Sequence, residues 1–212
     1  MTDHASAERA AVADLLDAVG PEAPTLCEGW ATYDLAAHLA LRDRVPAAWP
    51  GIALRRFAGR TERIQREFTA AHPFTECVSM IRRGAPMWSP MGAPLLAGLT
   101  NLAEYVVHHE DIRRAQPDWT ARAVPTTLAD SLWSQLRVTA RPAFRHAQDG
   151  VLLLRADTDQ SITAKRGPLV VAIEGDPVEL LLYAFNRRSV ARVDIRGDDA
   201  AVARLAIARI GM

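Results

Sequence analysis

The segment NLAEYVVHHEDIRRAQP, residues 101 to 117, concentrates ionisable side chains in an otherwise apolar stretch. Glu104 and His108 are four residues apart, so in an α-helix they lie about 40° apart on one face, and Asp111 falls in the same stripe. Leucine and valine side chains take the opposite side, which is typical of a buried helix. A buried charge is costly unless it is paired or bound to a metal. We therefore expect Glu104 and His108 to be two ligands of one metal ion.

A third ligand is predicted on an earlier helix, within the segment GWATYDLAAHLALRD. His38 shares its side of that helix with Leu35 and Leu41, so it should point inward. Asp34 lies one turn earlier on the same face, where its carboxylate could hold the imidazole in a fixed tautomer as an outer support. Together with Glu104 and His108, this predicts a mononuclear site with two imidazoles and one carboxylate.

Simpler interpretations of the same residues exist. Glu104 and His108 could form a hydrogen-bonded pair in a polar seam, and a lone histidine such as His38 could be a satisfied core group. His109 could cap helix carbonyls or meet the partner domain, while Arg113 and Arg114, in the last helical turn, suit the negative helix end. A di-iron bundle fits less well, because it requires several carboxylates and paired ExxH motifs.

Periodicity divides the chain into two parts. Up to about residue 140 the apolar spacing is helical, and after residue 150 short β-branched or alternating runs predict strands. This predicts a mainly helical domain over residues 1–140 and a small α+β domain over 141–212. The predicted helices cover 5–19, 32–45, 61–72, 74–83, 94–116 and 126–140, with breaks at Pro73 and Pro142; the predicted strands lie within 150–157, 161–166, 169–176 and 191–198.

Two helix starts are predicted in the C-terminal part. Asp176 is placed to cap a helix that has Pro177 at its first position and Glu179 at its third, the pattern of a capping box. The segment RGDDAAVARL repeats the same order of strand, Gly-Asp and helix.

The composition limits the kinds of partner that we expect the protein to bind. The chain has 25 basic and 25 acidic residues, so no electrostatic footprint for nucleic acid or an anionic membrane is visible. No apolar run approaches the roughly 20 residues of a membrane span, and the start MTDHASAERA lacks the order of a signal peptide, so we expect a cytoplasmic protein. Cys27 and Cys77 have no CxxC partner, and each is expected to be a small buried hydrophobe.

Two motifs resemble a known family. LCEGWATYDLAAHL resembles the GW-x-x-x-D-L-x-x-H-L signature of DinB-like metal-binding bundles, specifically the mycothiol-dependent maleylpyruvate isomerase N-terminal family. EYVVHHED is similar to that family's E-x-x-x-H-x-x-D segment, and EGDPVELLLYAFNRR and VDIRGDDAAVARL resemble its small C-terminal domain. The string HHEDIRRAQP looks closer still to an uncharacterised metal-binding branch of the family.

The resemblance implies an α+β protein: a DinB-like four-helix bundle of the up-down-down-up type, followed by a small C-terminal α+β domain. It implies that His38, Glu104 and His108 hold a divalent metal, usually Zn²⁺, with a water in the open position. Asp34 and Asp111 are the expected outer supports. Mycothiol is the implied cosubstrate, and the partners are a small thiol and a small electrophile.

The sequence also departs from the family pattern. Ala31 stands where a helix-capping Thr is common, so Thr32 or the Asp34 side chain must cap that helix. His109 stands where many relatives have Gly. The family implies a catalytic arginine in the C-terminal domain, for which four residues compete here: Arg187, Arg188, Arg192 and Arg196.

Three functions follow from such a site. A metal ion with an open position can bind a thiol as its thiolate, which predicts thiol addition or transfer to a small electrophile. Metal-assisted hydrolysis and a non-catalytic metal-binding or sensing module are the alternatives. The sequence leaves the electrophile, the catalytic residue and the oligomeric state unassigned.

Overall fold

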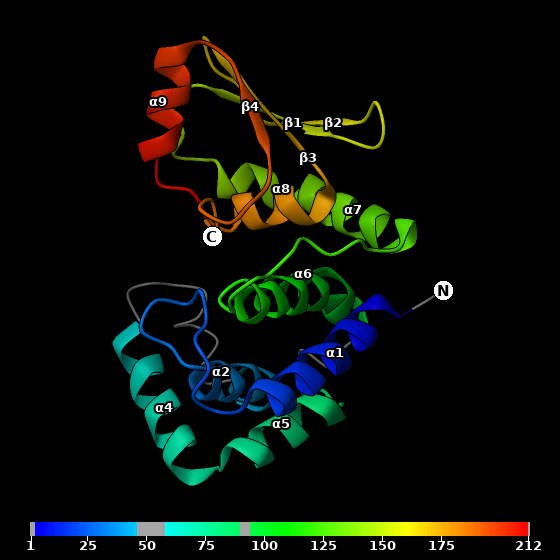
Figure 1. The fold of residues 1–212 in the computed structure, drawn as a ribbon, viewed down its shortest axis with the longest axis vertical. Helices are drawn as coiled ribbons and strands as arrows, with labels where there is room; N and C mark the ends of the chain where they lie inside the picture. Colours follow the sequence, from blue (N-terminus) through cyan, green and yellow to red (C-terminus); the bar gives the residue numbers. More distant parts are fainter. Residues whose placement is uncertain (1–2, 46–57, 90–93, 212) are drawn as a thin grey trace. The chain divides into compact units, whose positions relative to one another are not determined.

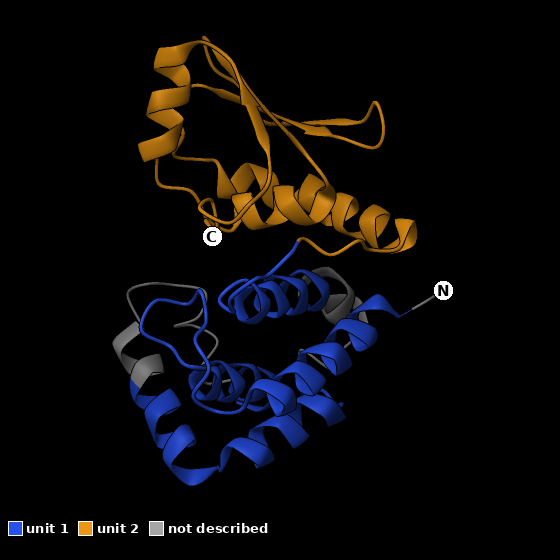
Figure 2. Ribbon diagram, in the orientation of Figure 1, with its two compact units in different colours: residues 1–120 blue, residues 121–212 orange. Residues whose placement is uncertain are grey.

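The computed structural model describes residues 3–45, 58–89 and 94–211. The chain divides into two compact units, residues 1–120 and 121–212 (Figure 2). Within the described residues, the first unit contains five helices, and the second contains three helices and a four-stranded sheet (Figure 1). The predicted α+β class is therefore confirmed.

The first unit is helical throughout its regular structure. Helix α1 packs against α5 and α6, and α2 packs against α4 and α5. Its core is formed by leucine, valine and alanine side chains of α1 and α2 together with Cys77 and Ile81 of α5 and Tyr105 and Ile112 of α6. The up-down-down-up order of a four-helix bundle stays a prediction. The helices are α1 (His4–Val19), α2 (Thr32–Arg44), α4 (Ala58–Ala71), α5 (Phe74–Arg83) and α6 (Pro94–Arg113).

Local signals explain where these helices begin and end. The Asp3 side chain caps α1 by accepting the Ser6 N–H, and α1 stops at Gly20, which has φ of 80°. The predicted break at Pro73 separates α4 from α5. The last helix of the unit, α6, ends at Arg113 rather than at the predicted Gln116.

The second unit is built around its sheet, in the order β2-β1-β3-β4. Strand β1 pairs antiparallel with β2 and parallel with β3, and β4 pairs antiparallel with β3. Alternate residues of the first three strands are buried, and α7 contacts β2 while α8 contacts β3. The elements are α7 (Thr126–Ala143), β1 (Gly150–Arg155), β2 (Ser161–Lys165), β3 (Val170–Gly175), α8 (Pro177–Ala184), β4 (Asp194–Arg196) and α9 (Asp199–Ile207).

A glycine allows the chain to pass from β2 to β3. A Cβ at Gly167 would lie 2.2 Å from the backbone nitrogen of Gly150, closer than any side chain tolerates. The connection therefore crosses the start of β1 in direct backbone contact, which only glycine permits.

Helix α7 belongs to the second unit, and this corrects the predicted boundary at 140/141. The units divide after Thr120, because α7 packs on α8 and β2. The helix also runs through Pro142, which was expected to stop it. The carbonyl that Pro142 leaves without a helical N–H partner belongs to Val138, an exposed residue whose backbone water can reach.

The capping-box prediction for α8 is half right. Asp176 is the N-cap and Pro177 the first helical residue, but the Glu179 carboxylate accepts the N–H of Arg192 at 2.8 Å instead of closing the box. The following helix, α9, is capped as predicted, since Asp198 accepts the N–H groups of Ala200 and Ala201. Among the residues that the structure describes, no helix combines the length and apolar character that a membrane crossing needs.

Candidate metal centre

Helices α2 and α6 bring the three predicted ligands together. The Oε1 atom of Glu104 lies 3.5 Å from Nε2 of His38 and 3.4 Å from Nε2 of His108. The three ligand atoms all lie within 4.8 Å of one another. The spacing that the sequence predicted, with two residues from one helix and one from another, is therefore present.

The distances within this group are longer than good hydrogen bonds. An N–H···O bond is shortest and strongest near about 2.9 Å. Donor atoms held about 2.0 to 2.1 Å from a tetrahedral zinc ion are about 3.3 Å apart along each edge of the tetrahedron. The distances from the Glu104 oxygen to the two imidazole nitrogens, 3.5 and 3.4 Å, thus match the separation expected of ligands around one small cation.

The ionisable groups perturb one another strongly. Burial raises the pKa of Glu104, but hydrogen bonds from His108 and His38 and the Arg42 charge outweigh it and hold that pKa well below its usual value. Burial lowers the pKa of His108, but contacts with Asp111, Cys27 and Glu104 outweigh it and raise that pKa well above its usual value. In the metal-free protein this is an ion pair of carboxylate and imidazolium.

The two histidines of the group are nearly buried and the glutamate is more exposed. The side chains of His38, Glu104 and His108 are 12%, 23% and 11% exposed. Solvent therefore reaches the group mainly at Glu104.

The far side of the His108 ring faces Asp111. Nδ1 of His108 lies 2.9 Å from Oδ2 of Asp111, whose side chain is fully buried. With a metal bound, a proton held on Nδ1 by this carboxylate would leave the lone pair of Nε2 for the metal ion. Asp111 therefore contacts His108 as an outer support should.

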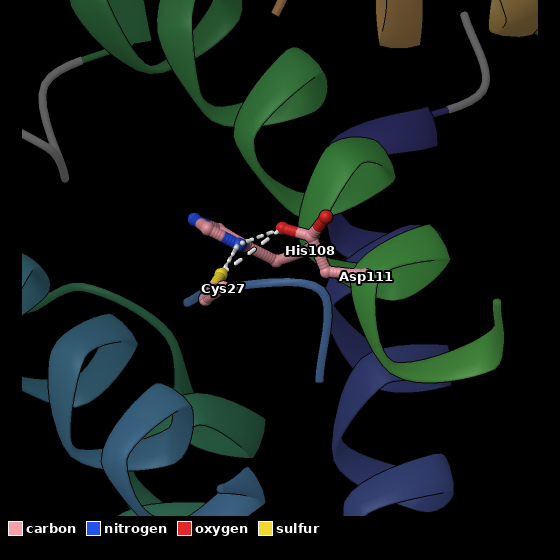
Figure 3. A group of neighbouring side chains, drawn as sticks. All are labelled: Cys27, His108 and Asp111. Atoms are coloured by element: carbon pink, nitrogen blue, oxygen red, sulfur yellow. Dashed lines mark hydrogen bonds and ion pairs between the residues drawn. The ribbon is translucent and has the colours of Figure 1, made fainter. Parts of the chain in front are cut away.

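A cysteine that the sequence analysis treated as a core residue joins this contact. The Cys27 thiol donates to Oδ2 of Asp111 at 3.3 Å, and its sulfur lies 3.9 Å from Nδ1 of His108. Figure 3 shows the three side chains converging, Cys27 from the loop before α2 and the other two from α6. The loop is fixed to α6 by a backbone bond from Leu26 N–H to the Asp111 carbonyl, 3.0 Å long.

Cys27, His108 and Asp111 also qualify by distance as a ligand group of their own. The 2.9 Å separation of Nδ1 and Oδ2 is that of a hydrogen bond, and it is shorter than the edge of a zinc coordination sphere. The two groups share the His108 ring, with Nε2 in one and Nδ1 in the other. This arrangement suits a metal ligand on one side and its support on the other.

Asp34 does not support His38 in the described structure, which corrects that prediction. Its Oδ2 accepts the Ala31 N–H at 3.0 Å, because Asp34 is the third residue of α2 and its side chain reaches back to the helix start. The capping role proposed for Asp34 is thus confirmed. The rings of Trp30 and His108 flank His38, with centroids 5.1 and 5.6 Å away.

A buried arginine adjoins the Glu104 carboxylate. Nε of Arg42 lies 3.7 Å from Oε1 of Glu104, and its terminal nitrogens donate to Asn101 at 2.7 Å and to Asp43 at 3.3 Å. Asp43 in turn accepts the Tyr105 hydroxyl at 2.9 Å. Sequence reasoning missed Arg42, although it follows His38 by four residues and so lies on the same face of α2.

The remaining charges of the opening segment have other partners. His109 contacts Glu8 of α1, with Nδ1 3.1 Å from the carboxylate, which differs from the predicted capping of helix carbonyls. Arg113 and Arg114 bind Glu110, and the guanidinium of Arg114 is buried, 4.7 Å from the centre of the Trp119 ring. These arginines pair with a buried carboxylate rather than serving only the helix dipole.

The four C-terminal arginines have structural contacts within the second unit. Arg188 donates to the carbonyls of Leu205 and Ala206 at the end of α9. The guanidinium of Arg187 donates to the Phe185 carbonyl. The backbone N–H of Arg192 donates to Glu179, and Arg196 forms an ion pair with Glu174 at 3.2 Å.

Comparison with known proteins gives a fold relationship. No family model and no curated protein matches the chain. The crystal structure of the mycothiol-dependent maleylpyruvate isomerase matches 90% of this chain and 88% of its own, with a TM-score of 0.51 and 16% identity. A histidine-to-alanine mutant of that isomerase matches over the same shares at a TM-score of 0.52 and 16% identity. The chain is distantly related in structure to this isomerase.

Proposed function

We propose that His38, Glu104 and His108 bind one divalent metal ion, with zinc as the preferred metal. The observation that carries this proposal is the convergence of three ligand atoms from two helices within 4.8 Å. Two imidazoles and one carboxylate are a donor set that zinc favours, and three protein ligands leave a position for a further ligand. The 23% exposure of the Glu104 side chain supports access of that further ligand to the site.

The metal would serve to activate a low-molecular-weight thiol for transfer to, or isomerisation of, a small electrophile. When bound, a zinc ion stabilises a small thiol as its thiolate, so no protein cysteine has to act as the nucleophile. The fold is like that of an isomerase described as mycothiol-dependent. Mycothiol is therefore the thiol we propose for this protein.

The neighbouring residues would prepare the site for an anionic thiolate. Glu104 offsets only part of the charge of a divalent cation, and the Arg42 guanidinium 3.7 Å away adds positive charge. Asp111 keeps the Nδ1 proton of His108 and so fixes the ring that presents Nε2. The chain's own contribution is a rigid ligand set, a guanidinium beside the carboxylate ligand and a fixed histidine tautomer.

Cobalt substitution tests this function directly. Cobalt-loaded protein is titrated with mycothiol, glutathione and cysteine, and we expect mycothiol to add a near-ultraviolet sulfur-to-cobalt absorption and to change the visible bands. The Cys27→Ser variant is the control, since it should keep the added absorption if the sulfur comes from the small thiol. Unchanged spectra with all three thiols would contradict the proposal.

Turnover is then measured with maleylpyruvate as the first electrophile. We expect isomerisation that requires both metal and mycothiol. Turnover of ester or amide substrates without any thiol would instead favour the hydrolytic function.

A further inference from the structure

The second unit carries an open groove between α7 and β2, with a volume of about 900 Å³. Two of its lining residues lie on α7 and a third, Arg145, lies in the turn that follows it, while six consecutive residues, 161 to 166, line the groove from β2 and its end. Five of the lining residues are cationic and none is acidic: Arg137, Arg141, Arg145, Lys165 and Arg166. The groove is therefore strongly positive, although the whole chain has no net charge.

The groove follows an unpaired strand edge. In the sheet order β2-β1-β3-β4, strand β2 has a described neighbour only on its β1 side (Figure 1). Side chains of a strand alternate between two faces, yet all six consecutive residues line the groove. The shared feature of these residues is their backbone, so the outer N–H and C=O groups of β2 face the groove.

Two arginines of the groove have the spacing of a strand's alternate residues. Arg137 and Arg141 are four apart on α7, which places them about 6 Å apart along the helix. Alternate residues of an extended peptide are about 6.6 Å apart. A strand added beside β2 could therefore bring acidic side chains to both arginines at once, and Arg145, two residues beyond the end of α7, adds a third positive charge to the groove.

These cations are available for a ligand. Within the described part of the chain, three arginines of the groove are exposed and form no ion pair with a carboxylate: Arg137, Arg141 and Arg166. Lys165 donates to the Arg145 carbonyl at 3.0 Å and so links β2 to the end of α7. Because the acceptor is a backbone carbonyl, this bond does not neutralise the positive charge of Lys165.

We propose that this groove binds an extended acidic peptide segment of a partner protein as an added strand next to β2. Main-chain hydrogen bonds to the strand edge supply the docking geometry, and Arg137 and Arg141 select acidic residues at alternate positions. Single-stranded nucleic acid also carries regularly spaced negative charge. The open strand edge favours a peptide, because its N–H and C=O groups match those of another strand and not a phosphate backbone.

Fluorescence anisotropy of the full chain with a labelled peptide tests the proposal. The probe is a short fluorescein-labelled peptide in which Glu alternates with Thr, and the matched peptide has Pro in place of each Thr. Both peptides carry the same charge, but the proline peptide cannot pair with β2 through those positions. We expect saturable binding of the first peptide and no saturable binding of the second.

Two protein variants locate the binding. Arg137→Glu with Arg141→Glu should weaken binding by at least about tenfold, because two attractions become repulsions. Arg66→Glu with Arg209→Glu makes the same charge change at exposed arginines outside the groove and should leave binding nearly unchanged.

Three results would overturn the proposal. Equal binding of the proline peptide would show that charge alone acts, and equal weakening by both variant pairs would place binding elsewhere. A labelled oligothymidine that binds more tightly than the Glu-Thr peptide, and is lost with Arg137→Glu and Arg141→Glu, would assign the groove to nucleic acid.

Discussion

Helix α6 carries two buried charge clusters, each built on a glutamate, and they differ in their contacts. Glu110 accepts from Arg113 at 3.0 and 3.1 Å and from Arg114 at 2.6 Å, and its side chain is 0% exposed. Around Glu104 the distances from Oε1 to His38, His108 and Arg42 are 3.4 to 3.7 Å. The two glutamates are six residues apart on one helix. Among the described contacts, only those of Glu110 are charge-assisted hydrogen bonds of normal length.

The difference separates a structural cluster from a binding site. The Glu110 cluster satisfies its buried carboxylate with two arginines, so it needs nothing further to be stable. The Glu104 cluster brings a carboxylate and two imidazoles together, and it holds the carboxylate at the spacing of a metal ligand from each imidazole. The ionisable residues of segment 101–117 therefore have two explanations, and variants of each cluster should affect different properties.

The largest effect on stability is expected at the Glu110 cluster. Glu110→Ala leaves the buried Arg114 guanidinium without this carboxylate and should lower the free energy of unfolding by about 3 to 5 kcal/mol. Urea unfolding measures the loss, and metal analysis of the folded fraction should give the same stoichiometry as wild type. A Glu110→Ala variant as stable as wild type, or one that folds but has lost its metal, would contradict the assignment of different roles to the two clusters.

The next largest effect is expected on metal affinity, from the loss of the Asp111 carboxylate that contacts His108. Asp111→Asn removes the carboxylate that holds the Nδ1 proton, and it should weaken metal binding by about 10 to 100-fold. Cys27→Ser keeps a donor to Asp111 and should have a much smaller effect. Competition with a chromophoric chelator measures both, and an Asp111→Asn affinity equal to wild type would remove Asp111 from the site.

The smallest effect is a pH dependence of the metal-free protein. The pKa of His108 is raised in the fold, so its protonated form stabilises the protein below about pH 6.5, the unfolded value, and this stabilisation is lost as the pH rises through the folded pKa. The pKa of Glu104 is lowered, so its stabilisation is present above about pH 4.3 and is lost as the pH falls through the folded value.

Chelator-treated protein should therefore be most stable in weakly acidic solution. Urea midpoints recorded at about pH 5.5 and about pH 8.5, on either side of the unfolded histidine value, should fall with pH. The His108→Gln variant should lose this part of the dependence. Identical pH profiles for the variant and wild type would contradict the ion pair.

Helical spacing explains how much of the site the sequence could predict. Glu104, His108 and His38 follow from two amphipathic patterns, because a helix fixes which residues share a face. Cys27 lies in a loop whose path depends on a tertiary bond between Leu26 and Asp111, and no local pattern encodes that path. Asp34 also shares the face of His38, but its carboxylate accepts the Ala31 N–H at the start of the helix instead.

The fold, like the site, could be predicted from the sequence only in part. Strand and helix positions after residue 150 follow from alternation, glycines and caps, and the structure confirms them closely. The assignment of α7 to the second unit depends on which apolar surface it meets, and periodicity alone does not contain that choice. Glu179 likewise fits a capping box locally, but the Arg192 N–H reaches it through the tertiary fold.

Metal analysis of wild type and five purified variants tests the central claim most directly. Wild type grown with ample zinc should carry about one ion per chain, and His38→Ala, Glu104→Ala and His108→Ala should each lose nearly all of it, because each removes one of three protein ligands. His109→Ala should keep its metal, and His109→Gln covers the case in which loss of the Glu8 contact impairs folding. Full metal in all of these variants, or none in wild type, would contradict a site at His38, Glu104 and His108.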